Sequence, residues 1–246
     1  CSQDCIGPLA RSVEDCAIIL EQIAGHDPRD PTSSTEPVPN YLAGLERGID
    51  GLRFGFDPKY NSRGVDRDMV TTVRKTLTTL TAMGAELREV TFPKTDVVVE
   101  EWRAHCSIET AFAHRHTYPK QKEQYGPALA SLIDLGLSLS AGDYQRILLN
   151  RYDFSGKVKT MFQDIDVLVV PAQGQASPTL EQRKLSRKSP EATASLLRFT
   201  APFDLTGSPA LTMPSGFTKT GLPIAIQFVG RHFEEDILIR AGHAYQ

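Results

Sequence analysis

Arg151 is the residue with the clearest chemical potential, because its charge falls on an apolar helix face. After Ser140, apolar residues recur at helical spacing, namely Tyr144, Ile147, Leu148, Phe154, Val158, Met161 and Phe162. Arg151 follows Tyr144 by two helical turns on that same side. Such a guanidinium could bind a carboxylate or a polar amide of a ligand by paired hydrogen bonds. Alternatively, it forms a structural ion pair, or its charged end reaches solvent while its aliphatic part packs on the apolar face. Both interpretations are open, and Arg151 and Tyr144 are our substrate-binding candidates.

Histidine and acidic side chains do not predict a metal site. His114 and His116 are two positions apart and do not share a helix face, and Arg115 between them would repel a cation. His105 and Glu109 have helical spacing, but two potential ligands without a third are weak evidence. We interpret this pair as part of a polar helix face, and we expect no metal.

The cysteines suggest neither a disulfide framework nor a zinc site. Cys1, Cys5, Cys16 and Cys106 form no C-x-x-C pair and no zinc spacing with histidine, so we expect reduced, inert thiols. One alternative gives Cys1 a role as an N-terminal nucleophile that self-cleavage exposes, with its own amine as the base.

Several function classes are disfavoured by composition and by missing motifs. The net charge of -3 and the lack of a basic run argue against nucleic acid and against anionic membrane surfaces. No G-x-S-x-G elbow, phosphate loop or G-x-G-x-x-G turn is present, so no cofactor is expected. No apolar stretch reaches the roughly 20 residues of a membrane span, and the first residues lack signal-peptide zones. We therefore expect a cytoplasmic protein.

The elements that position these residues predict an α/β fold. A helix from Arg11, with Ser12 as its cap, is expected to end at Gly25. A strand at 52–56, a helix from Asp66 to Gly84 and a strand at 86–92 form a crossover unit, which is typical of a sheet covered by helices.

The remaining elements extend that sheet. Residues 97–163 are predicted to be helical, with breaks near Pro119, Gly126 to Pro127 and Gly136. The almost wholly apolar segment 166–172 predicts a strand inside the sheet. Strands at 210–217 and 224–230 and a last helix from about Glu234 follow, so the sequence predicts a mixed β-sheet flanked by helices.

Four segments, in order, resemble the amidase signature family, which includes small amidases and one of the subunits of glutamyl-tRNA amidotransferase. They are DCIGPLARSVED at 4–15, DPRDPTS at 27–33, Tyr144 to Arg151 followed by IDVLVVPA, and PFDLTGSPALTMPSGFTKTGLPIAIQFVG at 202–230. The resemblance covers essentially the whole chain. It implies that residues 1–246 are the C-terminal part of a single amidase signature domain, with a partial amidase-signature fold.

The resemblance also implies chemistry on a small-molecule amide, hydrolysed by a Ser-Ser-Lys mechanism. In the family the lysine relays protons through one serine while the other attacks the carbonyl. All three residues precede the motif that begins here at Asp4, so none is assigned to this chain and we expect the chain alone to be inactive. Arg151 aligns with an arginine that some members use to hold a polar or carboxylate end of the substrate.

Two further expectations follow. The surface that a missing half would cover is expected to promote self-association of the chain. The alternative function is a non-catalytic pseudoenzyme or small-molecule-binding module that retains the same half fold.

Overall fold

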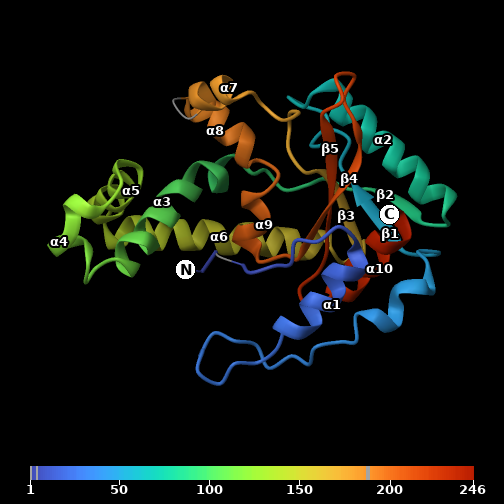
Figure 1. Ribbon diagram of the computed structural model, residues 1–246, viewed down its shortest axis with the longest axis horizontal. Helices are drawn as coiled ribbons and strands as arrows, with labels where there is room; N and C mark the ends of the chain where they lie inside the picture. The colour runs from blue at the N-terminus through green and yellow to red at the C-terminus, as the bar shows by residue number, and fades with distance from the viewer. Residues whose placement is uncertain (1, 4, 187–188) are drawn as a thin grey trace.

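A five-stranded mixed sheet with helices on both faces forms the centre of the protein (Figure 1). The structure is a computed structural model that describes residues 2–3, 5–186 and 189–246. The strand order is β2-β1-β3-β5-β4, with β1 parallel to β2 and β3, and β5 antiparallel to β3 and β4. The strands are β1 Arg53–Phe56, β2 Glu86–Glu89, β3 Val167–Pro171, β4 Ala210–Phe217 and β5 Pro223–Val229. The predicted α/β class and the mixed sheet are confirmed.

The predicted crossover unit is present as β1, α2 (Arg67–Ala82) and β2. Gly84 follows α2 with a φ of 90°, a conformation that glycine adopts without steric cost, so the chain reverses there as expected. The second strand is shorter than predicted and ends at Glu89. Its continuation turns away because the N–H of Phe92 donates to the side chain of Asp57 rather than to a strand.

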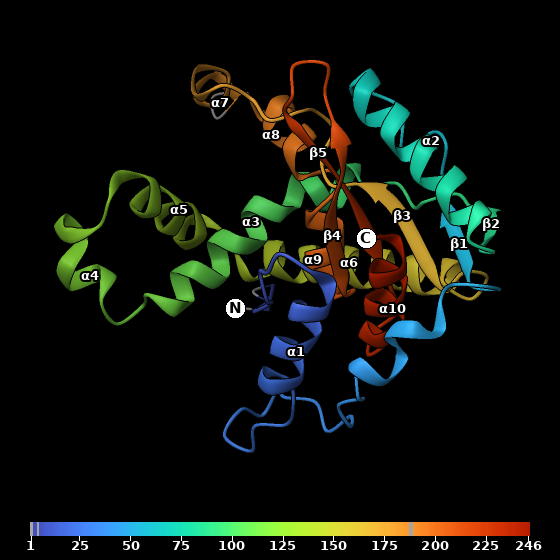
Figure 2. The same ribbon diagram turned by 45° about the vertical axis from the view of Figure 1, so that its right-hand side comes forward.

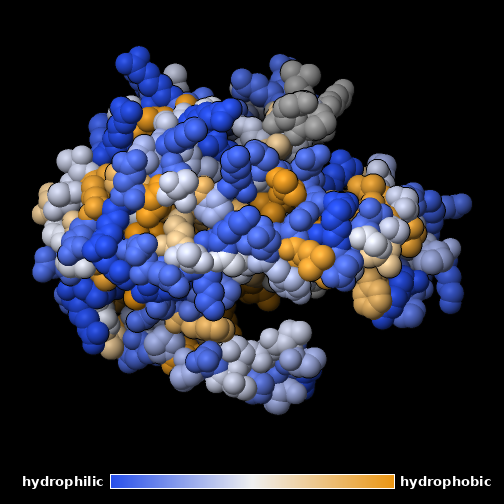
Figure 3. All heavy atoms as spheres, turned by 180° about the vertical axis from the view of Figure 1, so that it is seen from behind, coloured by the Kyte–Doolittle hydropathy of each residue, from blue (hydrophilic) through white to orange (hydrophobic). Residues whose placement is uncertain are grey.

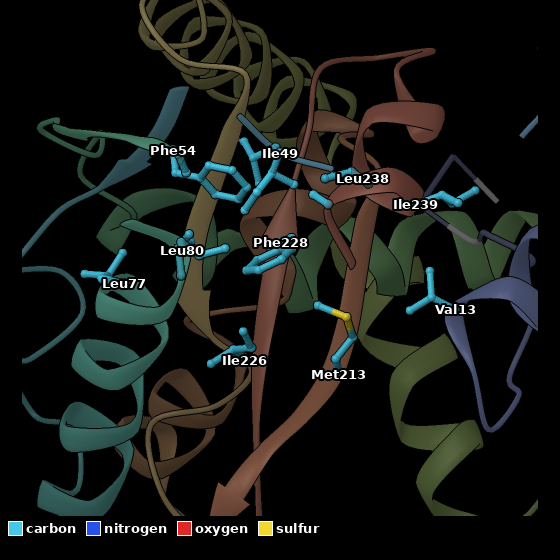
Figure 4. Close-up of a cluster of buried hydrophobic side chains, with 14 of the residues drawn as sticks. Val13, Ile49, Phe54, Leu77, Leu80, Met213, Ile226, Phe228, Leu238 and Ile239 are labelled. Carbon is cyan, nitrogen blue, oxygen red and sulfur yellow. The ribbon is translucent and has the colours of Figure 1, made fainter. Parts of the chain in front are cut away.

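Strand β3 divides the core, because its side chains alternate between two faces that are both buried. Val167 and Val169 contact one cluster, formed with α2 and with α10 (Glu235–Tyr245), which Figure 4 shows around Phe54 and Phe228. Leu168 and Val170 contact the other cluster, under α6 (Ala141–Met161). The prediction of an interior strand is therefore confirmed.

A helical arm extends from one side of the sheet (Figures 1 and 2). It contains α3 Asp96–Ala113, α4 Tyr118–Gln121, a 3-10 turn at Lys122–Gln124, α5 Pro127–Ser138 and the first turns of α6. The break predicted near Gly136 falls three residues later, at Leu139, and Gly136 itself lies inside α5. A Cβ atom there would lie 2.0 Å from the carbonyl oxygen of Ser107, so Gly136 allows α5 to pack closely on α3. Leu139 directly precedes Ser140, whose capping box begins α6.

The other helices cover the sheet and its edges. They are α1 Val13–Ile23, a 3-10 helix at Leu42–Arg47, α7 Leu180–Ser186, α8 Pro190–Leu197 and α9 Ala201–Thr206. The Ser12 hydroxyl caps α1 by accepting from the N–H of Asp15, as predicted. Within the described residues, no helix has both the length and the apolar character that a membrane span requires.

Candidate functional site

Arg151 lies on α6 beside the buried residues Ile147 and Phe154, half-buried itself. Its Nε donates to the carbonyl oxygen of Leu205 at 2.6 Å. Its Nη1 donates to the hydroxyl of Ser2 at 2.7 Å, and its Nη2 donates to the carbonyl of Ser2 at 3.2 Å. Three of the five guanidinium N–H groups thus have acceptors, and the remaining two have none among the residues that the structure describes.

No carboxylate pairs directly with Arg151 within the described parts of the chain. The guanidinium is held by a backbone carbonyl of α9 and by the N-terminal segment. The bond to Leu205 is partly buried, whereas the Nη atoms that reach Ser2 lie at the surface. The free N–H groups belong to these Nη atoms and are therefore open to a ligand that approaches from the surface.

Glu109 on α3 holds Ser2 from the other side. The Ser2 hydroxyl donates to Oε1 of Glu109 at 2.6 Å, and the Ser2 N–H donates to Oε2 at 2.7 Å. Burial of Glu109 alone would raise the pKa of its carboxyl, but the two bonds from Ser2 and the contact with His105 outweigh burial and lower this pKa. Glu109 is consequently ionised at neutral pH, and the Ser2 hydroxyl lies between its negative charge and Arg151.

His105 was expected on a polar helix face, and this interpretation is wrong. Its side chain is 0% exposed, and both ring nitrogens have partners. Nε2 lies 3.1 Å from Oε1 of Glu109, and Nδ1 lies 2.8 Å from the side-chain nitrogen of Gln3. One neutral tautomer satisfies both contacts, with Nε2–H as donor and Nδ1 as acceptor, so the ring can be buried. Burial is also the main cause that lowers the pKa of His105.

Tyr144 reaches the same cluster. Its ring lies 5.9 Å from the His105 ring in an edge-to-face arrangement. Burial raises the pKa of the Tyr144 phenol, and the negative charge of Glu109 adds to this shift. The structure therefore brings together the two predicted residues, Arg151 and Tyr144, as neighbours of one histidine and one carboxylate.

A cavity of about 10 Å³ lies beneath Arg151. Its lining residues are Val98, Glu101, Trp102, His105, Ile147, Arg151 and Leu205. This volume holds about one water molecule, and the indole N–H of Trp102, which has no partner among the described residues, could donate to it. The cavity is too small for an amide substrate, so a ligand of Arg151 must bind on its surface side.

The other sequence candidates are two histidines and the cysteines. Nδ1 of His114 lies 3.0 Å from the hydroxyl of Tyr125, and His116 is exposed. Cys5 and Cys16 are free thiols, and the thiol of Cys106 donates to the side-chain oxygen of Gln3 at 2.9 Å. Cys1 and the nucleophile role considered for it lie outside the described residues. Across the described ranges, no group of three or more His, Cys, Asp and Glu side chains could hold a metal ion.

Three members of the cluster were not predicted from the sequence, for different reasons. His105 and Glu109 carried a signal in their spacing of four, which places both on one helix face, but their polarity suggested a solvated face. Ser2 carried no signal, because only the folded chain brings it between Glu109 and Arg151.

Sequence comparisons identify relatives over the whole chain. The Amidase family model matches residues 1–239. Putative amidase AmiD of Mycobacterium tuberculosis is 39% identical over all 246 residues, which cover 51% of that protein. A glutamyl-tRNA(Gln) amidotransferase subunit of Geobacter sp. strain M21 is 32% identical, and here the chain covers 55% of the relative. The chain thus spans about half the length of these relatives.

Solved structures show the same fold. A 6-aminohexanoate cyclic dimer hydrolase matches 96% of this chain with a TM-score of 0.82 and 21% identity, over 53% of its own chain. A bacterial aryl acylamidase of the amidase signature family matches 97% of this chain with a TM-score of 0.80 and 19% identity, over 52% of its own chain. These likenesses show the fold, and the family model that matches residues 1–239 confirms the predicted family: the chain belongs to the amidase signature family.

Proposed function

We propose that the protein that contains this chain hydrolyses the carbon–nitrogen bond of small-molecule amides. The family match over residues 1–239 is the observation that carries this proposal. The chain corresponds to about half the length of its relatives, among them a putative amidase. In this proposal residues 1–246 are the C-terminal part of one amidase signature domain, and a Ser-Ser-Lys set outside these residues performs the chemistry.

The role proposed for this chain is to supply part of the sheet and one wall of the substrate site. Arg151 supports this role, because two of its N–H groups lack acceptors among the described residues and lie on surface-exposed Nη atoms. Tyr144 lies against the His105 ring, and its hydroxyl has no hydrogen-bond partner in the described part of the protein. These two residues would hold the polar end of the amide substrate.

The chain alone is proposed to be inactive. Nucleophile and base act as a unit in such mechanisms, so loss of both leaves almost no catalysis. A wall of the substrate site orients a ligand, but it supplies neither a bond-forming atom nor a proton acceptor for the attack.

The test is ammonia release from a panel of simple primary amides by the complete protein and by residues 1–246 alone. Turnover by the complete protein and none by the isolated chain is the expected result. A complete protein that binds amides without turning any of them over would support the non-catalytic binding module instead. Turnover by the isolated chain would contradict the assignment of the chemistry to residues outside it.

A further inference from the structure

The guanidinium of Arg151 and the carboxylate of Glu109 are separated by a single hydroxyl group. The Ser2 oxygen accepts from Nη1 of Arg151 at 2.7 Å and donates to Oε1 of Glu109 at 2.6 Å. The hydroxyl proton points toward the carboxylate, so the Ser2 oxygen presents its lone pairs to the guanidinium. The positive and negative charges are thereby held at a fixed, short separation.

Two other described groups near Arg151, Glu101 and His105, have partners of their own. Glu101 lines the cavity beneath Arg151, but its carboxylate pairs with Arg146 and accepts from the side chain of Asn150 at 2.9 Å. His105 is buried in a neutral form, because burial lowers its pKa. Hydrogen bonds through the Ser2 hydroxyl link Arg151 to the carboxylate of Glu109, and this negative charge offsets the positive charge of the guanidinium.

We propose that Glu109 determines which ligands Arg151 accepts, and that the preferred ligand group is an uncharged oxygen acceptor, such as an amide carbonyl, rather than a carboxylate. This inference rests on the proposed function, because only an amide-hydrolysing protein would use this preference to select its substrate. It makes Glu109 a specificity-determining residue that acts through Ser2 and Arg151, without contact with the substrate.

The physical reason is repulsion between like charges near the surface of the protein. An arginine without a balancing charge binds carboxylates most strongly, since a bidentate ion pair is its best contact. A carboxylate on the free N–H groups of Arg151 would lie near ionised Glu109, whose side chain is only 13% exposed, so their repulsion would be screened less than between two charges in water. A neutral carbonyl accepts the same hydrogen bonds and meets no such repulsion.

The experiment compares two probes of nearly equal shape, butyramide and butyrate, on the complete protein at pH 7. Ligand-observed NMR measures the affinity of each probe, and Arg151→Met shows which part of the signal comes from this site. The expected result is tighter binding of butyramide to the Arg151 site of the wild-type protein. Tighter binding of butyrate, or no Arg151-dependent binding of either probe, would overturn the proposal.

The variant Glu109→Gln removes the charge and keeps an oxygen that can accept from Ser2. It should shift the ratio of butyrate to butyramide affinity by about tenfold toward butyrate. Glu109→Asp retains the charge and should keep the wild-type ratio. Glu100→Gln is the matched control, because Glu100 is an exposed carboxylate on the same helix, and the ratio should not change. An unchanged ratio of butyrate to butyramide affinity in a folded Glu109→Gln variant would overturn the proposal. If this variant does not fold, the comparison of the two probes on the wild-type protein tests the proposal by itself.

Binding and turnover separate the two levels of inference. If the complete protein fails to hydrolyse any amide but still prefers butyramide at Arg151, the proposed function fails and the role of Glu109 stands. If it hydrolyses amides and binds butyrate more tightly at Arg151, the role of Glu109 fails and the proposed function stands.

Discussion

The hydroxyl of Ser2 donates a 2.6 Å hydrogen bond to Glu109, a residue 107 positions away in the sequence. The backbone N–H of Ser2 binds the second oxygen of the same carboxylate. Arg151 on α6 donates to Ser2 from the other side, so Ser2 is held between α3 and α6. The geometry of the candidate site therefore depends on where this segment lies as much as on the helices that carry Arg151 and Tyr144.

Replacing Arg151 by methionine should weaken catalysis more than folding. In the complete protein we expect kcat/KM for amides with a polar end to fall by about tenfold or more, because a hydrogen bond from a charged group is lost. Unfolding experiments should show a loss of about 1 kcal/mol, since the Leu205 carbonyl loses its donor. Lys159→Met, on an exposed position of the same helix, is the control and should change neither quantity much. Unchanged kinetics with a marked fall in stability would instead show that Arg151 is structural.

Asp166 should make the free energy of unfolding depend on pH in the acid range. It accepts from Arg53 and Arg231 at the end of the central strands. Burial opposes its ionisation, but the bonds from Arg53 outweigh burial and hold the pKa of Asp166 at about 2, below the ordinary value of 3.8. The folded pKa is depressed, so the contribution to stability is complete above pH 3.8 and disappears as the pH falls through about 2.

Asp166→Asn should consequently reduce the free energy of unfolding by about 2 kcal/mol at pH 7 and by much less near pH 2. Denaturant unfolding at both pH values measures this difference. Asp153→Asn is the control, because the pair of Asp153 with Lys157 is exposed and should contribute little at either pH. Equal destabilisation by Asp166→Asn at both pH values would contradict the assignment.

Gly136→Ala should destabilise the helical arm. The added Cβ would lie 2.0 Å from the carbonyl oxygen of Ser107, so α5 must move away from α3. We expect a loss of about 3 kcal/mol in the free energy of unfolding, as for other overpacked interiors. Gly156→Ala on α6 is the matched control, because nothing lies within 4 Å of its Cβ position and the change should stabilise the helix by about 0.5 kcal/mol. Equal effects of the two substitutions would show that the α3 and α5 contact is looser than described.

The isolated chain should self-associate. Ile6 and Leu9 are 92% and 99% exposed, β4 is an edge strand, and apolar side chains interrupt the hydrophilic surface on the face in Figure 3. Sedimentation of residues 1–246 should show oligomers that Leu9→Ser reduces, while Leu137→Ser on the arm has less effect. A strictly monomeric chain that binds no hydrophobic dye would contradict this prediction.

Local patterns were sufficient to predict most of the sheet. The apolar run at 166–172 predicted an interior strand, and its side chains do fill both core clusters. The glycine at 84 marked a helix end because a positive φ is needed there. Gly136 located the end of α5 only approximately, because a glycine inside a helix can serve close packing on a neighbour, which the sequence alone does not distinguish from a helix break.

The candidate site was only partly predictable. Arg151 and Tyr144 were identifiable because a charge on an apolar helical stripe is unusual. The burial of His105 could not be predicted, because it requires Gln3 and Glu109 as partners of the two ring nitrogens. Gln3 comes from a segment without regular structure. Contacts between distant segments of this kind leave no periodic pattern in the sequence.

The most direct test of the proposed function is to locate the reactive nucleophile of the complete protein. A sulfonyl fluoride that labels activated serines would be allowed to react, and the modified residue identified by peptide mass spectrometry after loss of amidase activity. We expect a single modified serine outside residues 1–246, protected by an amide substrate. Substrate-protected modification of Cys1, or of any serine within residues 1–246, would contradict the proposal that this chain supplies only the sheet and one wall of the site.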